Sequence, residues 1–288
     1  MRFKLVDEAK KTFPIQRLCD VLGVSESGYF AWKNRGPSQR QLADMVLLAH
    51  IRSRFELSHE TYGSPRMHIE LCEDDVPVGR HRVARLMRDN SMKALQKRRY
   101  RKTTDSDHGG LVAPNLLDQN FCCDSPDQKW GVDISYIWTR EGWLYLAIVL
   151  DLYSRRIVGW ETSDRLKKDL AITALKRAIV IRQPAAGLIH HSDRGSQYCS
   201  YDYRKLLAAN DMHSSMSGKG NCFDNAMVET VFKTIKSELV WRASFQTRQQ
   251  ATNALGRYID GFYNPIRRHS ALAYKSPIKF EAKMAETD

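Results

Sequence analysis

Three acidic residues that stand far apart along the chain could act together: Asp133, Asp193 and Glu229. The surrounding patterns predict that they lie on a strand, at a strand end and on a helix, from which they can converge. Carboxylates are the hard oxygen ligands that hold Mg²⁺. Two such ions roughly 4 Å apart can activate a water nucleophile and stabilise the leaving oxygen of a phosphodiester. The three acids therefore predict a two-metal site for cutting and joining DNA, with Mg²⁺ as cofactor and Mn²⁺ as a substitute. We expect Asp133 to bridge the ions, Asp193 to hold one and Glu229 the other.

Each acid also has an ordinary structural explanation. Asp133 could be a strand-edge residue, Asp193 could cap a turn, and Glu229 could be a solvated helix residue. The joint placement of all three favours metal binding. Asp151 is a fourth acid in an apolar run, and it could support the site or pair with a neighbouring arginine.

Cations near the acids are candidates for DNA binding. Lys233 and Lys236 follow Glu229 by four and seven residues, so they share its helix face and could hold phosphates beside the scissile bond. An ion pair between Glu229 and Lys233 is the alternative. The glycine-rich loop 217–225 carries Lys219 and could close on substrate. This loop lacks the spacing of a nucleotide-binding loop, so no nucleotide cofactor is expected.

Four further polar residues are predicted to position the substrate: His191, Tyr198, Asn221 and Asn225. For His191, a hydrogen bond at the end of a strand is an equally good interpretation.

The charge balance favours a polyanionic partner. The chain has 45 Lys and Arg against 33 Asp and Glu, a formal charge of +12 and a pI near 9.4. Between residues 80 and 102 the only acid is Asp89, beside a run of cations. We predict that the following members of this run bind DNA, although a solvated face is the alternative: Arg80, Arg82, Arg85, Arg88, Lys97, Arg98, Arg99 and Arg101.

Two helical modules are predicted before the acids. Residues 1–38 form a helix-turn-helix pattern, in which Pro14 opens a helix, Gly23 permits the turn and Ser25 caps the next helix. A helical hairpin without DNA contact fits this pattern equally well. Residues 39–95 form a second module, whose last helix has an arginine face beside an apolar face, as a DNA-recognition helix requires.

A linker and a mixed α/β core should follow. Residues 96–128 look like a basic linker that could follow a DNA backbone. Residues 129–242 show three strands (129–139, 142–153 and 156–162) and then alternating helices and strands, the order of a ribonuclease-H-like fold. Residues 243–288 should form a helix, 246–263, packed on the core, and a basic tail whose Arg267, Arg268 and His269 either touch DNA or are solvated.

Other classes of protein are disfavoured. The six cysteines show no zinc-ligand spacing and no disulfide framework, so we expect buried or incidental thiols and no zinc. The longest apolar run, 143–150, is too short to cross a bilayer. We therefore expect a soluble, cytoplasmic protein without a membrane partner.

Three motifs carry a family resemblance: Trp130-Gly-Val-Asp-Ile-Ser-Tyr, His191-Ser-Asp-Arg-Gly-Ser-Gln-Tyr, and the stretch from Ser215 to Glu229. The chain resembles the second-frame transposase of a bacterial insertion sequence, within the retroviral-integrase-like DDE recombinases. This resemblance implies that the family's acids fall on Asp133, Asp193 and Glu229. It also implies that the protein joins element ends to target DNA, acts as a homo-oligomer on DNA, and works with an upstream-frame protein that has a helix-turn-helix and a leucine zipper.

Two alternative functions remain open at this point. Spacing alone would allow a metal-dependent, structure-selective nuclease without joining activity. A DNA-binding regulator with an inactive core is the other alternative, which the intact acids disfavour.

Overall fold

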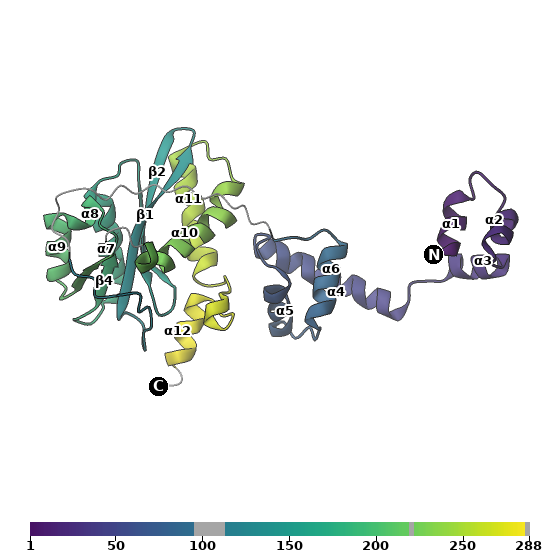
Figure 1. Ribbon diagram of the computed structural model, residues 1–288, viewed down its shortest axis with the longest axis horizontal. Coiled ribbons are helices and arrows are strands. Elements are labelled where there is room, and N and C mark those ends of the chain that lie inside the picture. Colours follow the sequence, from purple (N-terminus) through teal and green to yellow (C-terminus); the bar gives the residue numbers. More distant parts are fainter. Residues whose placement is uncertain (95–112, 219–221, 286–288) are drawn as a thin grey trace.

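The computed structural model describes residues 1–94, 113–218 and 222–285. Two helical modules precede a mixed α/β core, as the sequence predicted (Figure 1). Within the described residues, no helix is both long enough and apolar enough to cross a membrane.

The first module has three helices: α1 (Arg2–Ala9), α2 (Ile15–Leu22) and α3 (Glu26–Asn34). Gly23 ends α2 with a φ of 60°, the left-handed conformation that glycine adopts without strain. Ser25 caps α3 by accepting a hydrogen bond from the Gly28 backbone nitrogen at 3.1 Å. The predicted turn between these helices is therefore confirmed. Buried in the small core of the module are Val6, Cys19 and Tyr29.

The second module consists of α4 (Gln39–Leu57), α5 (Ser64–Glu73) and α6 (Arg80–Asp89). Ser38 and Gln41 form a reciprocal capping box at the start of α4, which satisfies two backbone donors there. The apolar face of α6 buries Val83, Leu86 and Met87 in the core of the module.

The core contains a five-stranded sheet in the order β3-β2-β1-β4-β5. Strands β1 (Lys129–Thr139), β2 (Gly142–Asp151) and β3 (Ile157–Ser163) form the predicted antiparallel meander. Strands β4 (Ile189–Ser192) and β5 (His213–Met216) join it in parallel. Helix α7 (Lys168–Arg182) connects β3 to β4, helices α8 (Ser196–Cys199) and α9 (Tyr201–Ala208) connect β4 to β5, and α10 (Ala226–Glu238) follows β5. The predicted order of elements is confirmed.

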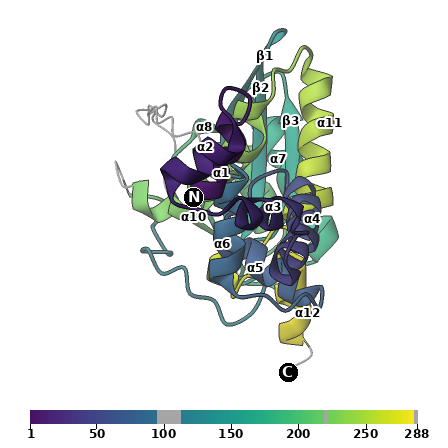
Figure 2. The same cartoon turned by 90° about the vertical axis from the view of Figure 1, so that its right-hand side faces the viewer.

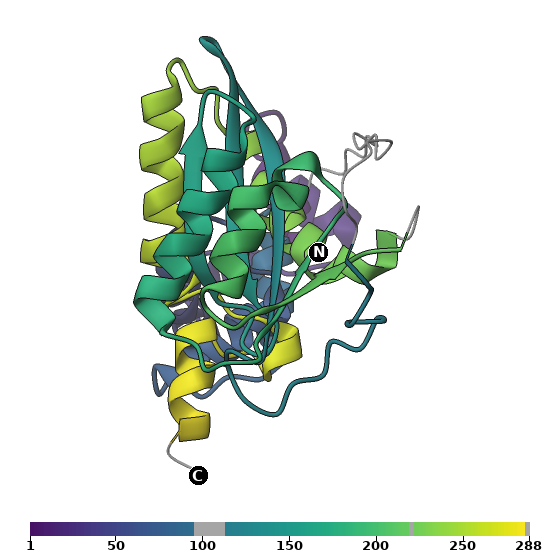
Figure 3. The same cartoon turned by 90° about the vertical axis from the view of Figure 1, so that its left-hand side faces the viewer.

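Helices cover both faces of the sheet (Figures 2 and 3). Alternate residues of β1 and β2, such as Val132 and Val149, pack against α7 and α9. The opposite set, such as Ile137 and Ile148, packs against α10 and α11 (Arg248–Tyr258). This two-sided burial fixes the register of β1, because a slip of one residue would move each side chain to the wrong face.

The C-terminal segment packs on the core. Helix α11 continues into a π-helical turn, Ile259–Tyr263, and α12 (Pro277–Ala285) follows. Short 3₁₀ turns lie at Cys222–Asn225, Val240–Arg242 and Ser270–Leu272. The described part of the predicted linker also joins the core, since Leu117 is buried and Leu116 donates its backbone hydrogen to Ser215 Oγ at 2.9 Å.

Buried ion pairs fasten the second module to the C-terminal segment. Arg268 donates to Glu70 Oε2 at 2.5 Å and to both oxygens of Glu73, on α5. Arg267 forms a two-pronged ion pair with Glu238, the last residue of α10. Both arginines are 4% exposed, so the prediction that they touch DNA or are solvated is wrong for them. Carboxylates on elements distant in sequence neutralise them instead.

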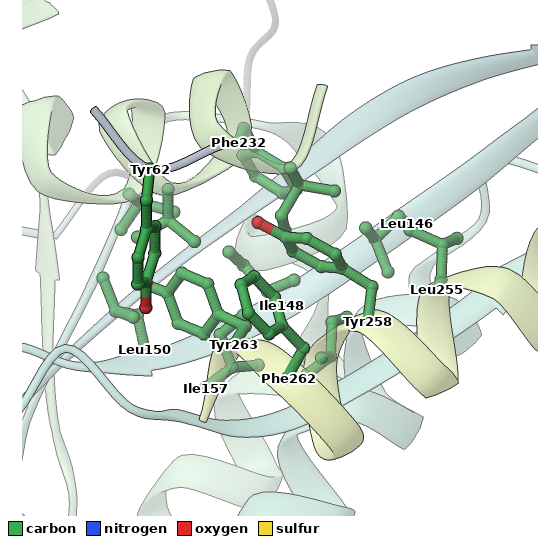
Figure 4. Packing of buried hydrophobic residues seen from close by; sticks show 14 of the residues in the cluster. Tyr62, Leu146, Ile148, Leu150, Ile157, Phe232, Leu255, Tyr258, Phe262 and Tyr263 are labelled. Carbon is green, nitrogen blue, oxygen red and sulfur yellow. The ribbon is translucent and has the colours of Figure 1, made fainter. Parts of the chain in front are cut away.

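An apolar contact accompanies these ion pairs. Tyr62, between α4 and α5, lies in the same buried cluster as Leu150 and Tyr263 (Figure 4). Its hydroxyl accepts a hydrogen bond from the Arg268 backbone nitrogen at 2.8 Å. The second module and the core therefore share one hydrophobic cluster.

Candidate active site

The sheet brings two of the three acids together. Strands β1 and β4 pair in parallel, with Lys129 beside Ile189 and Gly131 beside His191. The same spacing sets Asp133 level with Asp193, just beyond the end of β4. Asp133 Oδ1 accepts a hydrogen bond from the Ile134 backbone nitrogen at 2.7 Å. Asp193 Oδ1 accepts one from the Gly195 backbone nitrogen at 2.9 Å.

Electrostatics show that the acids influence one another. Burial raises the pKa of Asp133, and the negative charges of Asp193 and then Glu229 raise it further. The Ile134 hydrogen bond and the Lys236 ammonium act in the opposite direction. A carboxylate that is partly withdrawn from water and lies beside two like charges resists ionisation unless a cation compensates it. Asp133 is therefore the centre of a cluster of negative charge, which we call the acidic pocket.

Glu229 lies at the rim of this pocket. It is in the first turn of α10 and exposed, and partial burial raises its pKa. Among the described residues, no three His, Cys, Asp or Glu side chains stand close enough to hold a metal ion together. The structure thus brings Asp133 and Asp193 together and leaves Glu229 nearby with its side chain outward.

The donor set fits a hard divalent cation. Carboxylate oxygens prefer Mg²⁺ or Mn²⁺ to softer metals. Two neutral oxygens beside the acids, the Tyr198 hydroxyl and Asn225 Oδ1, are buried and have no hydrogen-bond partner in the described part of the chain. Such oxygens in an acidic pocket suit hydrated cations, whose water ligands donate hydrogen bonds. Asp133, Asp193 and Glu229 could therefore hold the predicted ions.

Tyr198 and Asn225, two of the predicted positioning residues, lie in the wall of the pocket. Burial, followed by the charges of Asp133 and other neighbours, raises the pKa of Tyr198. Asn225 donates to the Val132 carbonyl at 3.5 Å, one residue before Asp133. Lys219 and Asn221 fall outside the described residues.

His191 has a different environment from that of a substrate contact. Its imidazole is buried, with Nδ1 2.9 Å from Ser215 Oγ and Nε2 3.1 Å from Ser217 Oγ. Burial lowers its pKa to about 4, so it is neutral at pH 7. Both ring nitrogens are engaged, so His191 holds the ends of β4 and β5 in place. Ser215 on β5 and Ser217 just after its end are supporting residues that sequence reasoning missed, and their spacing by two was the available signal.

Asp224 is a second missed residue. It is 1% exposed, and its Oδ2 accepts hydrogen bonds from the Gly218 backbone nitrogen and Asn115 Nδ2, both at 3.0 Å. These bonds connect both ends of the glycine-rich loop to the segment before β1. Asp151, in contrast, caps the turn after β2 through Ser154 and lies opposite Trp130, away from the other acids.

The two lysines of α10 differ in environment. Lys236 is partly buried, and burial lowers its pKa while the charge of Asp133 raises it. Lys233 is exposed. Of the two, Lys236 is the cation that belongs to the acidic pocket.

The arginines of α6 also fall into two pairs. Arg82 and Arg85 each form an ion pair with Asp44 of α4 at 2.7 Å. Arg80 and Arg88 are exposed. Because Asp44 holds Arg82 and Arg85, the arginines of α6 that extend furthest into solvent are Arg80 and Arg88. Four other predicted DNA-binding residues, Lys97, Arg98, Arg99 and Arg101, lie outside the described residues.

Comparison with known families assigns both halves of the chain. Residues 124–222 and 229–284 match integrase core domain families, and residues 41–100 match an HTH-like domain. The second integrase match includes α11, which packs on the sheet, and α12.

Full-length relatives come from bacterial insertion elements. A Shigella sonnei protein, named as the uncharacterized 31 kDa protein of insertion element IS600, is 45% identical over 92% of this chain and 98% of its own. The transposase InsF for insertion sequence IS3A of Escherichia coli K12 is 38% identical over 98% of this chain and 99% of its own.

Solved structures are more distant. The HTLV-2 integrase catalytic core domain in complex with magnesium is 14% identical, with a TM-score of 0.43, and it matches 55% of this chain and 98% of its own. The simian T-cell lymphotropic virus intasome has a TM-score of 0.46 at 13% identity, over 80% of this chain and 74% of its own.

Proposed function

This chain belongs to the family of insertion-sequence transposases with an integrase core domain, and we propose that Asp133, Asp193 and Glu229 are the acids with which it cuts and joins DNA. The resemblance seen in the motifs is confirmed by this membership, and DNA transposase activity follows from it. The roles of individual residues are our proposal.

The observation that carries the proposal is the position of Asp133. Asp133 is half-buried, its partial burial raises its pKa, and two other acids raise that pKa further. A purely structural carboxylate is usually compensated by an arginine or by several backbone donors. The arrangement therefore supports a pocket that acquires its countercharge from divalent cations.

Asp133, Asp193 and Glu229 would hold two Mg²⁺ ions, with Mn²⁺ as a substitute. When bound, such ions lower the pKa of an attacking water and stabilise charge on the phosphate oxygens. Asp133 and Asp193 fix the site from the rigid sheet, and Glu229 completes it from α10. Tyr198 and Asn225 orient the groups that enter the pocket, and Lys236 attracts the phosphate.

Two successive displacements at phosphorus would use the same pocket. In the first, a water oxygen forms a bond to phosphorus, and the bond to the 3′ oxygen breaks, which leaves a free 3′ hydroxyl. In the second, that hydroxyl attacks a phosphodiester of the target, and the target's own 3′ oxygen leaves. The number of phosphodiester bonds is unchanged in the second step, so no external energy source is needed.

DNA contacts extend over the helical modules in this proposal. Arg80 and Arg88 are exposed on α6 and suit phosphate binding, while Arg82 and Arg85 hold α6 against α4. Both element ends and the target must be held at once, so we propose that a homo-oligomer assembles on DNA. We also propose that an upstream-frame protein assists in recognition of the ends.

The test is an assay of both steps. The protein is incubated with Mg²⁺ and labelled DNA from the ends of its own element, and cut and joined strands are scored. We expect both products from the wild type and neither from Asp193→Asn. Cutting without joining would indicate a nuclease, and specific binding without either product would indicate a regulator.

A further inference from the structure

Four aromatic side chains form a strip on the β1–β2 hairpin. Tyr136 pairs with Tyr145 across the two strands, and Trp138 pairs with Trp143. We call these four residues the aromatic strip. They have the same alternation as Val132 and Val149, so they lie on the α7 face of the sheet.

The rings of the strip contact one another in series. The Tyr136 and Tyr145 centroids are 5.2 Å apart, and those of Tyr136 and Trp143 are 6.1 Å apart. The Trp138 and Trp143 centroids are 4.9 Å apart, and all three pairs have edge-to-face geometry. Such pairs hold each ring in a defined orientation. The strip is therefore an ordered surface.

The outer end of the strip is open to solvent. Trp138 is 59% exposed and Trp143 is 47% exposed, near the tip of a hairpin that extends past the helices (Figure 3). Adjacent exposed indoles are costly in water and usually mark a binding surface.

The inner end of the strip lies near the acids, across the edge of β1. Tyr136 follows Asp133 by three residues on the same strand, so the two side chains point to opposite faces of the sheet. Strand β4 pairs with β1 only as far as Gly131, so no described strand covers this edge beyond that residue, and the two faces meet there. Burial raises the pKa of Tyr136, and Tyr145, Asp133 and Asp193 raise it further, which places its phenol within electrostatic range of both acids. The strip therefore begins on the opposite face from Asp133, beside the same edge of β1, and runs to the hairpin tip.

We propose that the aromatic strip binds unpaired bases of the DNA strand adjoining the scissile phosphate. Aromatic side chains stack on bases whatever their sequence, since every base has a π-face. DNA whose phosphate lay beside the acids could cross the edge of β1 that β4 leaves uncovered and continue past Tyr136 to Trp138. This inference rests on the proposed function for the position of the phosphate, but not on the chemical steps.

Charge favours DNA over a second copy of the chain. Arg140 is exposed at the turn of the hairpin, and Arg248 lies beside it, with Nε donating to the Trp143 carbonyl at 3.1 Å. The one acid of the turn, Glu141, already accepts the Arg248 backbone hydrogen at 2.8 Å. Two copies of a chain with a charge of +12 repel, whereas a polyanion is attracted.

The test compares binding of two DNA probes by the full-length protein in EDTA, so that cleavage cannot contribute. One probe is a blunt duplex of the element end, and the other has the same duplex with a single-stranded extension past the scissile phosphate. Fluorescence anisotropy gives each affinity. We expect the extended probe to bind about tenfold more tightly or better, as one stacked base per indole predicts.

Substitutions then identify the cause. Trp138→Leu with Trp143→Leu retains apolar surface but removes the planar rings, and we expect it to abolish the preference for the extended probe. Trp138→Phe with Trp143→Phe should preserve most of it. Ile181→Ala, at an exposed position of α7, is the control and should change nothing.

Three results would overturn the proposal. The wild type could show no preference for the extended probe, or the leucine variant could keep that preference. The third result is a leucine variant whose main defect, measured by sedimentation, is loss of self-association. Strand cleavage on blunt element ends is scored separately in all variants. Its absence in the wild type would count against the proposed function and leave the binding result interpretable.

Discussion

Val228 packs against Gly131 so closely that no side chain fits between them. A Cβ atom on Gly131 would lie 2.7 Å from Val228 Cγ2 and 3.0 Å from Leu152 Cδ2. Val228 immediately precedes Glu229 on α10, and Gly131 lies two residues before Asp133 on β1. The missing side chain therefore sets how near two of the proposed metal ligands can approach.

Gly131→Ala should displace α10 from the sheet. Overpacking of this kind costs about 2 kcal/mol of unfolding free energy, and it should reduce strand cleavage by more than this loss of stability explains, because Glu229 moves away from Asp133. Urea denaturation and the cleavage assay at a temperature where both proteins are folded measure the two effects. Normal cleavage in a destabilised Gly131→Ala would contradict the proposed role of the contact.

Removal of Arg268 should loosen the second helical module. The substitution Arg268→Ala strands Glu70 in a partly buried site, and loss of one partner of a buried pair costs about 3 kcal/mol. We expect faster proteolysis between residues 39 and 94 than in the wild type. Arg88→Ala, at a side chain that is 77% exposed, is the control and should leave the digestion pattern unchanged.

His190 should make the protein sensitive to acid. Burial lowers its pKa to about 3, with its own backbone hydrogen bond opposing and His191 reinforcing the shift. The neutral imidazole contributes its full share of the free energy of unfolding above about pH 6.5, the pKa of histidine in the unfolded chain. This stabilisation is lost as the pH falls from 6.5 towards 3. The raised pKa of Asp133 acts in the opposite direction, so a difference between two proteins is needed to isolate the histidine.

The comparison is wild type against His190→Gln. The wild type should be more stable at pH 7.5, where Tyr203 Oη lies 2.9 Å from His190 Nε2. Below pH 6.5 the difference in free energy of unfolding between the two proteins should narrow by about 1.4 kcal/mol per pH unit. A gap that stays constant between pH 7.5 and 5 would show that His190 titrates normally in the folded protein.

Lys236 should matter more for DNA binding at the pocket than Lys233. Lys236→Gln should weaken binding of element-end DNA and lower the slope of log affinity against log salt by about 1, the effect of one lost phosphate contact. Lys233→Gln, one turn earlier on the same helix and exposed, should have the smaller effect on affinity and on the salt slope. Equal losses of affinity in both variants would remove the distinction between the two lysines.

Local sequence patterns were sufficient to predict the elements of the core. Apolar runs and short turns delimited β1, β2 and β3, and Gly23 and Ser25 marked the turn of the first module through backbone conformation and capping. Asp133 and Asp193 could be predicted as neighbours because a strand and a parallel strand end have few relative placements.

Long-range pairing could not be predicted in the same way. Arg267 and Arg268 follow one another in a basic tail, and nothing in that tail indicates that Glu238, Glu70 and Glu73 neutralise them. The bonds of His191 to Ser215 and Ser217 likewise depend on β4 pairing with β5. The exposure of Glu229 was also not predictable, because it depends on how α10 packs against β1 at Val228 and Gly131.

The central claim is that the three acids form one site for paired divalent cations, and anomalous diffraction from crystals soaked in Mn²⁺ tests it most directly. We predict two peaks, one between Asp133 and Asp193 and the other between Asp133 and an inward-turned Glu229. Asp133→Asn crystals, treated identically, should show neither peak. Mn²⁺ bound elsewhere in the wild type, or unchanged peaks in Asp133→Asn, would contradict the claim.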